Sequence, residues 1–300
     1  MKKNLTEMVF ILDRSGSMQS LTSDTIGGFN SMIENQKNED GEAFVTTVLF
    51  DDNYELLHDH VDIQKIEPIT NKEYYARGTT ALLDAIGKTI NSIGSRLSST
   101  PEDERPDKVI FVITTDGFEN SSCEFTRHTV KEMIEHQQTK YSWTFMFLGA
   151  NMDAVSEASS LGISSAYSKT YTASAQGTSS AYYATCDALT RIRSMDAAMY
   201  CDAEAKGIAT AACLDYIDFA SSNEEAITTD AKITKLVDGI DSLSENYDSA
   251  IATLESTCDV LLDSCDAISA STLSIADNYC KSDALEAKVI SLDEINSVFA

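Results

Sequence analysis

Hydrophobic and polar positions follow two alternating patterns over roughly the first 170 residues. Short, continuous apolar runs are typical of strands inside a parallel sheet, and longer segments with apolar residues at helical spacing are typical of amphipathic helices. The predicted strands are 8–13, 43–50, 54–63, 108–115, 142–148 and 164–171, and the predicted helices are 25–36, 80–97, 125–138 and 151–161. This order predicts an α/β fold with a doubly wound, mostly parallel sheet, in which 43–50 and 54–63 form a hairpin.

The pattern changes after residue 172. No strand-like run follows, Pro106 is the last proline, and the last hundred residues contain 20 Asp and Glu against 5 Lys. We therefore predict an α/β domain over 1–172 and an acidic α-helical region over 181–300. The small and polar residues of Ala173–Ser180 are typical of a linker, and we predict one there.

Apolar residues recur every seven positions in the C-terminal region. The series comprises Ile240, Tyr247, Leu254, Leu261, Ile268 and Ile275. Sustained heptads predict a long helix whose apolar seam is covered by another helix, and Ser222 with Glu225 has the spacing of a capping box. Two arrangements stay open: a helical hairpin or small bundle within the chain, and a coiled coil that dimerises or docks a partner.

Composition narrows the classes of partner. Of the 300 residues 43% are hydrophobic, which suffices for a core, and the formal net charge is −26. Such a charge repels phosphates and anionic lipids, so we expect neither a nucleic acid nor a membrane partner. No apolar run approaches the roughly 18 residues of a membrane span. The run Met1–Glu7 does not resemble a secretory signal, and the seven cysteines include no Cys-x-x-Cys pair. We expect a cytoplasmic protein.

A polar run, Asp13-Arg14-Ser15-Gly16-Ser17-Met18, directly follows the first predicted strand. It places a carboxylate and two hydroxyls at the carboxyl end of a strand, where ligands bind in open α/β sheets. Small oxygen donors in one tight turn suit a hard divalent cation such as Mg²⁺. The run therefore indicates a metal-dependent binding site more than a catalytic one.

Two further motifs follow in order along the chain. The segment 77–86, Arg-Gly-Thr-Thr-Ala-Leu-Leu-Asp-Ala-Ile, opens a predicted helix, and 114–117, Thr-Thr-Asp-Gly, ends the central apolar strand. Together with Asp13-x-Ser15-x-Ser17, these motifs resemble the von Willebrand factor type A (vWA) domain family over residues 1–172. They look most like its small bacterial intracellular members of the tellurite-resistance type. The helical C-terminal region has no counterpart in this resemblance.

The resemblance implies a metal ion-dependent adhesion site (MIDAS) that holds Mg²⁺ or Mn²⁺. Its residues would be the hydroxyl ligands Ser15, Ser17 and Thr80, and the carboxylates Asp13 and Asp116, which in the family often hold the ion through water. Thr79 is the alternative to Thr80. Arg77 stands where a second glycine is common in the family, and its charge would either orient an acidic ligand or lie in solvent.

This ligand set predicts binding and not hydrolysis. Two carboxylates balance the charge of Mg²⁺, and the hydroxyls are neutral, so the octahedral ion keeps a position for a partner's Asp or Glu. We therefore expect an adaptor module and no enzyme, with a partner that presents its carboxylate in a basic neighbourhood. The resemblance suggests an ATPase or a stress-response complex as that partner.

Two other functions stay open, as does the oligomeric state. One is a Mg²⁺-dependent phosphohydrolase, although the first motif supplies neither a second carboxylate nor a lysine, and none of the four histidines falls in the motif loops. The other is a scaffold whose helical tail mediates oligomerisation.

Overall fold

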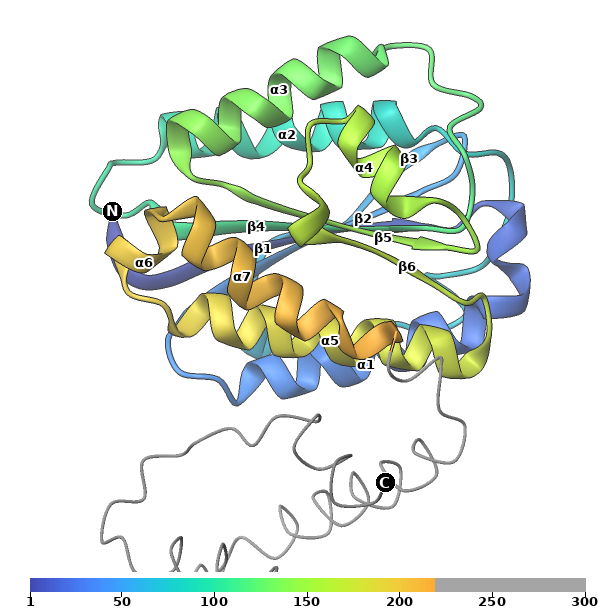
Figure 1. Ribbon diagram of the computed structural model, residues 1–300, viewed down its shortest axis with the longest axis horizontal. Helices are drawn as coiled ribbons and strands as arrows, with labels where there is room; N and C mark the ends of the chain where they lie inside the picture. The colour runs from blue at the N-terminus through green and yellow to red at the C-terminus, as the bar shows by residue number, and fades with distance from the viewer. Residues whose placement is uncertain (219–300) are drawn as a thin grey trace, which may run out of the picture. The chain divides into compact units, whose positions relative to one another are not determined.

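A six-stranded sheet forms the centre of the computed structural model, which describes residues 1–218. Its strands are β1 (Lys2–Asp13), β2 (Glu42–Phe50), β3 (Tyr54–Asp62), β4 (Pro106–Thr115), β5 (Thr144–Ala150) and β6 (Ser168–Tyr171). The strand order is β3-β2-β1-β4-β5-β6 (Figure 1). Neighbouring strands are parallel except for the antiparallel hairpin of β2 and β3. The predicted doubly wound, mostly parallel sheet is confirmed.

Helices cover both faces of the sheet. They are α1 (Thr22–Lys37), α2 (Leu82–Ser99), α3 (Arg127–Tyr141), α4 (Ala154–Ser160), α5 (Ala175–Ser194), α6 (Ala197–Cys201) and α7 (Ala203–Leu214), with the short 3-10 helices η1 (Gly16–Leu21), η2 (Ile63–Lys65) and η3 (Ser165–Tyr167). Figure 1 shows α2 and α3 over one face and α1 and α5 over the other.

The core is centred on β1. Every residue from Met8 to Leu12 is fully buried, because β2 and β4 flank the strand and helices cover both faces. This explains why the strand reads as a continuous apolar run and not as an alternating one. Against one face, the rings of Phe10 and Phe29 meet edge to face at 5.4 Å, an arrangement that aromatic pairs prefer.

The segment predicted as a linker is instead the start of α5. That helix begins at Ala175, and the Ser174 hydroxyl accepts a hydrogen bond from the Gly177 N–H at its N-cap. Small residues suit both a linker and close packing: a Cβ at Gly177 would lie 2.0 Å from the Thr172 carbonyl oxygen. Helices α5, α6 and α7 belong to the same compact unit as the sheet. The predicted boundary at residue 172 therefore does not separate the sheet from a helical region.

The remaining predictions for the C-terminal region concern residues that the structure does not describe. The capping box at Ser222 and the heptads from Ile240 to Ile275 lie outside residues 1–218. Within the described part of the chain, no helix combines the length and the apolar character that crossing a membrane requires.

Candidate metal site

The first and third motifs meet because of where β1 and β4 lie in the sheet. These two strands are parallel neighbours, and the helices that follow β1 and precede β4 cover opposite faces (Figure 1). Ligands bind at such a switch point, beyond the carboxyl ends of the strands. Asp13 is the last residue of β1, and Asp116 directly follows β4. The topology therefore brings both carboxylates to one edge of the sheet.

Short polar contacts connect four of the predicted ligands. The Ser15 N–H donates to Asp13 Oδ1 at 2.7 Å, and the hydroxyl oxygens of Ser15 and Ser17 lie 3.1 Å apart. The Ser17 hydroxyl then donates to Asp116 Oδ1 at 2.5 Å. Asp13 and Ser15 are buried, Asp116 is half-buried and Ser17 is exposed. The oxygens thus form a cluster that reaches solvent on its Ser17 side.

Thr80 joins the same cluster from the loop before α2. A Cβ built at Gly117 would lie 3.2 Å from Thr80 Oγ1 and 3.7 Å from Ser17 Oγ. The Thr80 hydroxyl therefore lies beside the turn that carries Asp116, where the missing side chain of Gly117 leaves room. The neighbouring Thr79 is exposed, whereas Thr80 is buried. The structure thus brings together Asp13, Ser15, Ser17, Thr80 and Asp116, and it leaves Thr79 exposed.

Burial disfavours negative charge in this cluster. Desolvation raises the pKa of Asp13 to about 6, although hydrogen bonds from Thr115 and Ser15 act in the opposite direction. Desolvation also raises the pKa of Asp116. Two partly desolvated carboxylates beside neutral hydroxyls are stabilised by a nearby cation. Their environment therefore fits a divalent ion.

The donor atoms indicate the kind of metal. Hard cations such as Mg²⁺ and Mn²⁺ prefer oxygen ligands, whereas zinc is typically bound by thiolate and imidazole. Within residues 1–218, no group of three or more His, Cys, Asp and Glu side chains is arranged to hold a metal. The predicted site, with two carboxylates and three hydroxyls, suits a hard cation with water among its ligands.

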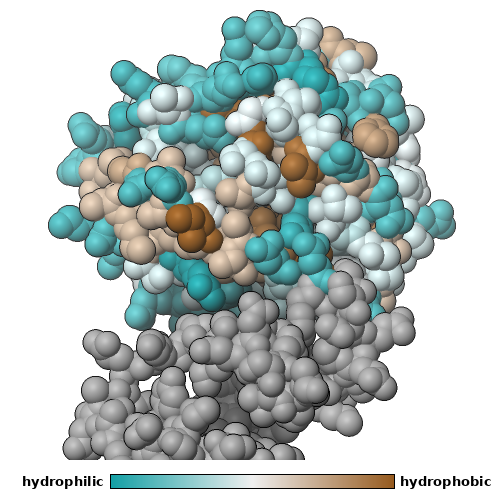
Figure 2. Space-filling view, viewed as in Figure 1, coloured by the Kyte–Doolittle hydropathy of each residue, from teal (hydrophilic) through white to brown (hydrophobic). Residues whose placement is uncertain are grey.

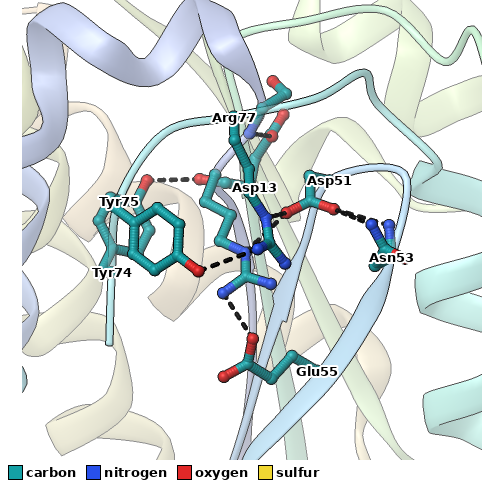
Figure 3. Close-up of polar contacts among 9 residues, drawn as sticks. Asp13, Asp51, Asn53, Glu55, Tyr74, Tyr75 and Arg77 are labelled. Atoms are coloured by element: carbon teal, nitrogen blue, oxygen red, sulfur yellow. Dashed lines mark hydrogen bonds and ion pairs between the residues drawn. The ribbon is translucent and has the colours of Figure 1, made fainter. Parts of the chain in front are cut away.

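An ion-pair network with a buried centre lies directly beside the site, and Figure 3 shows it in close-up. The fully buried Arg14 donates from Nε to Asp51 Oδ2 at 2.9 Å, and its Nη1 lies 2.7 Å from Glu55 Oε2. Arg77 donates from Nε to the same Asp51 oxygen at 2.7 Å. Burial alone would raise the pKa of Asp51, but hydrogen bonds from Arg77 and Asn53 outweigh it and lower that pKa. We call Arg14, Asp51, Glu55 and Arg77 the arginine clamp.

The arginine clamp ties the site loops together and settles the position of Arg77. Backbone hydrogen bonds run from the Arg77 N–H to the Arg14 carbonyl at 2.8 Å and from the Gly16 N–H to the Gly78 carbonyl at 3.2 Å. Arg77 thus neither lies free in solvent nor points a free charge at a ligand, because its guanidinium pairs with Asp51. Sequence reasoning missed Asp51, which it placed in an ordinary hairpin turn.

Two further carboxylates hold the loop after β4 against the start of α2. Asp84 accepts hydrogen bonds from the backbone N–H groups of three consecutive residues, 123–125, at 2.8–2.9 Å. Glu119 accepts from the Leu83 N–H at 2.9 Å. Asp84 lies four residues after Thr80 in the second motif, and that position was the only sequence signal for its role. These contacts fix the second and third motif loops relative to each other.

No protein-family model and no curated protein matches this chain. Among solved structures, it is similar to proximal thread matrix protein 1 from the mussel byssus, with 16% identity, a TM-score of 0.44, and coverage of 63% of this chain and 47% of that one. Another structure of the mussel protein is described as having a zinc-occupied MIDAS motif. The match therefore spans about half the length of the mussel protein.

Two other solved structures are similar over comparable parts of the chain. One is the vWF domain of the type V pili tip protein Mfa5 from Porphyromonas gingivalis, with 10% identity, a TM-score of 0.48, and coverage of 64% of this chain and 97% of that one. The other is the manganese-loaded TRAP protein of Plasmodium vivax, with 15% identity, a TM-score of 0.43, and coverage of 57% and 70%.

Proposed function

We propose that this chain carries a vWA-type, metal-dependent protein-binding site at the carboxyl edge of its sheet. A Mg²⁺ or Mn²⁺ ion would be held there and would bind an acidic residue of a partner protein. One observation carries the proposal: three segments far apart in the sequence bring their carboxylates and hydroxyls into one cluster. The ligands would be Asp13, Ser15, Ser17, Thr80 and Asp116.

The charge and exposure of the cluster support binding of an outside carboxylate. Asp13 and Asp116 together balance the charge of a divalent ion, and the hydroxyls add none. An octahedral ion with these ligands retains water positions that an incoming oxygen can take. The exposed Ser17 lies on the open side of the cluster, so a side chain of another protein has access from there.

The surroundings of the cluster give no support to a phosphohydrolase. Hydrolysis needs a positioned base near the metal-bound water. In the described part of the chain, His58 contacts Thr47, His60 contacts Glu7, and His128 and His136 lie on α3. The nearby arginines of the clamp pair with Asp51. We therefore propose a binding module and no enzyme.

The net charge of the chain indicates what kind of surface its partner should have. A chain of net charge −26 repels an acidic protein at long range, so the partner should present its Asp or Glu within a basic surface. The sequence resemblance supports a cytoplasmic setting and an ATPase or stress-response complex as the partner. A scaffolding role of residues 219–300 remains a separate prediction.

Metal titration of the full-length chain tests this proposal. We expect isothermal titration with MnCl₂ to show one site, and the double variant S15A/S17A to bind at least about tenfold more weakly, a loss of roughly 1.4 kcal/mol. Thr79→Ala is the matched control, because it removes an exposed hydroxyl next to the site and should leave affinity unchanged. Equal Mn²⁺ affinity in the double variant and the parent would refute the site.

Partner binding is tested separately. The full-length chain should capture its partner from a host lysate in Mg²⁺ and lose it in EDTA, and the S15A/S17A variant should fail to capture it in Mg²⁺. Substitution of single acidic residues on the captured protein should then identify the one that contacts the metal. Capture of the same protein in EDTA would contradict metal-dependent binding.

A further inference from the structure

A cavity of about 550 Å³ lies at the opposite edge of the sheet from the metal site, between α7, η3 and the start of β5. Its size falls within the ~300–1,000 Å³ that is usual for small-molecule sites. Aromatic and small side chains form most of its wall, among them Trp143, Phe145, Tyr167, Ala203 and Ala211. Figure 2 shows apolar side chains gathered over α6 and α7 on this face.

The cavity exists because β6 is short and α7 carries small residues. The pairing of β5 with β6 begins at Phe147, so the first residues of β5 have no strand beside them there. Helix α7 covers this gap with residues 203, 207 and 211, which are four apart and share one face. A Cβ at Gly207 would lie 3.5 Å from the Ala166 Cβ. Small residues thus bring the helix close and leave space around them unfilled.

A buried lysine lines this apolar space. Lys206 is 5% exposed, and its Nζ donates to the Ser142 carbonyl at 3.0 Å and lies 4.1 Å from the centre of the Tyr200 ring. The carbonyl belongs to the C-terminal end of α3, which supplies only a partial negative charge. Within residues 1–218, no carboxylate forms an ion pair with this ammonium.

An ammonium buried without a counter-charge is unfavourable. Accordingly, desolvation lowers the pKa of Lys206 to about 8. The exposed Glu204 also lines the cavity, but no ion pair joins it to Lys206 within residues 1–218, so the cavity combines a mostly apolar wall with one buried ammonium that no carboxylate pairs. A ligand with a carboxylate would supply the charge partner that the Lys206 ammonium lacks. Their hydrogen bond would be charge-assisted, and such bonds are stronger than neutral ones.

We propose that this cavity binds a small organic acid with a flat apolar body. The body lies against Trp143, Phe145 and Tyr167, and the carboxylate pairs with the Lys206 ammonium. A neutral alcohol or an amine of the same shape makes the same apolar contacts with the wall but cannot pair with the Lys206 ammonium. The cavity therefore selects its ligand by charge. This site does not depend on the proposed metal site, because the two lie at opposite edges of the sheet.

Trp143 reports on the cavity directly, because it is the only tryptophan in the chain. The full-length chain in EDTA is titrated with phenylacetate, 2-phenylethylamine and 2-phenylethanol, which share a ring and a two-carbon chain and differ in charge. We expect a saturable fluorescence change with phenylacetate and at least tenfold weaker binding of the amine and the alcohol. Lys206→Met should remove this preference for the acid.

Two further variants separate binding from folding. Lys65→Met removes a lysine whose side chain is 75% exposed, and it should bind phenylacetate as the parent does. Ala211→Phe fills the cavity and should abolish the response to all three probes, while far-UV circular dichroism checks that the fold is kept. Equal affinity for the three probes in the parent, an unchanged preference in Lys206→Met, or no saturable response to phenylacetate would each overturn the proposal.

Discussion

Asp51→Asn tests whether the arginine clamp is a buried ion-pair network that organises the site. The substitution keeps the shape of the side chain and removes its charge. Asp51 is the buried carboxylate that pairs with both arginines, and the other partner of Arg14, Glu55, has a side chain that is 46% exposed. Removing one partner of a buried ion pair typically destabilises by about 3–5 kcal/mol, because a charge is left uncompensated. Since Glu55 remains, we expect a loss of about 3 kcal/mol.

The matched variant is Arg77→Met, which removes the more exposed partner of the same carboxylate. The Arg77 side chain is 40% exposed, so its loss should cost at most about 1 kcal/mol, as for surface ion pairs. Urea unfolding followed by Trp143 fluorescence measures both variants, because that residue lies in the described unit. If Asp51→Asn costs no more than Arg77→Met, Asp51 is not the counter-ion on which the buried Arg14 depends.

The loss of stability caused by Asp51→Asn should depend on pH in a definite direction. The pKa of Asp51 is lowered in the folded chain from an ordinary value of 3.8. A carboxylate with a lowered pKa stabilises the fold above its unfolded pKa, and this contribution is lost as the pH falls through the folded value. The stability difference between the parent and Asp51→Asn should therefore stay constant above about pH 5 and shrink below pH 3.8. A difference that grows on acidification would refute the reasoning.

Three other substitutions probe separate parts of the fold by urea unfolding. Asp84→Asn should cost about 2–3 kcal/mol, because a charged acceptor of three backbone N–H groups becomes a poorer one; a cost below about 0.5 kcal/mol would contradict that role. Gly28→Ala should cost about 1–3 kcal/mol through overpacking, since its Cβ would lie 2.4 Å from the Tyr182 ring, and a neutral result would show that α1 and α5 adjust freely. Lys206→Met should be more stable than the parent at pH 7. This gain in stability should diminish as the pH rises from about 8 towards 10.5, because the buried lysine of the folded parent loses its proton in that range. A gain that increases with pH would contradict this reasoning.

Local patterns were sufficient to predict the sheet, and the five site residues stay a prediction whose side chains the structure places close together. A strand buried on both faces needs a continuous apolar run, so β1, β4 and β5 were recognisable from their own residues. Carboxyl ends of parallel strands share one edge, so motifs that follow β1 and β4 had to lie close together. These two regularities explain why the residues after β1 and β4 lie close together, whereas the choice of Thr80 and Asp116 as ligands is what the resemblance to the vWA family implies.

Contacts between segments far apart in the sequence could not be predicted from local sequence patterns. The pairing of Arg14 with Asp51 joins the end of β1 to a hairpin turn, and neither position carries a periodic signal. The helix α5 begins among small residues because Gly177 packs against Thr172, whereas composition alone favours a linker there. Lys206 was unremarkable in a helical segment, and its contact with the Ser142 carbonyl joins two residues that are 64 positions apart.

The arginine clamp contains none of the proposed metal ligands. The site loops therefore lose their conformational freedom when the chain folds, and not when an ion binds. Contacts within the protein hold the loops that bear Ser15 and Thr80 in place in the folded chain. An ion that binds at the proposed site would therefore find its ligands already positioned. Ion binding then requires little further loss of conformational entropy, and affinity gains from such preorganisation. At the proposed site, ion exchange and partner release would then be repeated, reversible events on a scaffold that keeps its shape.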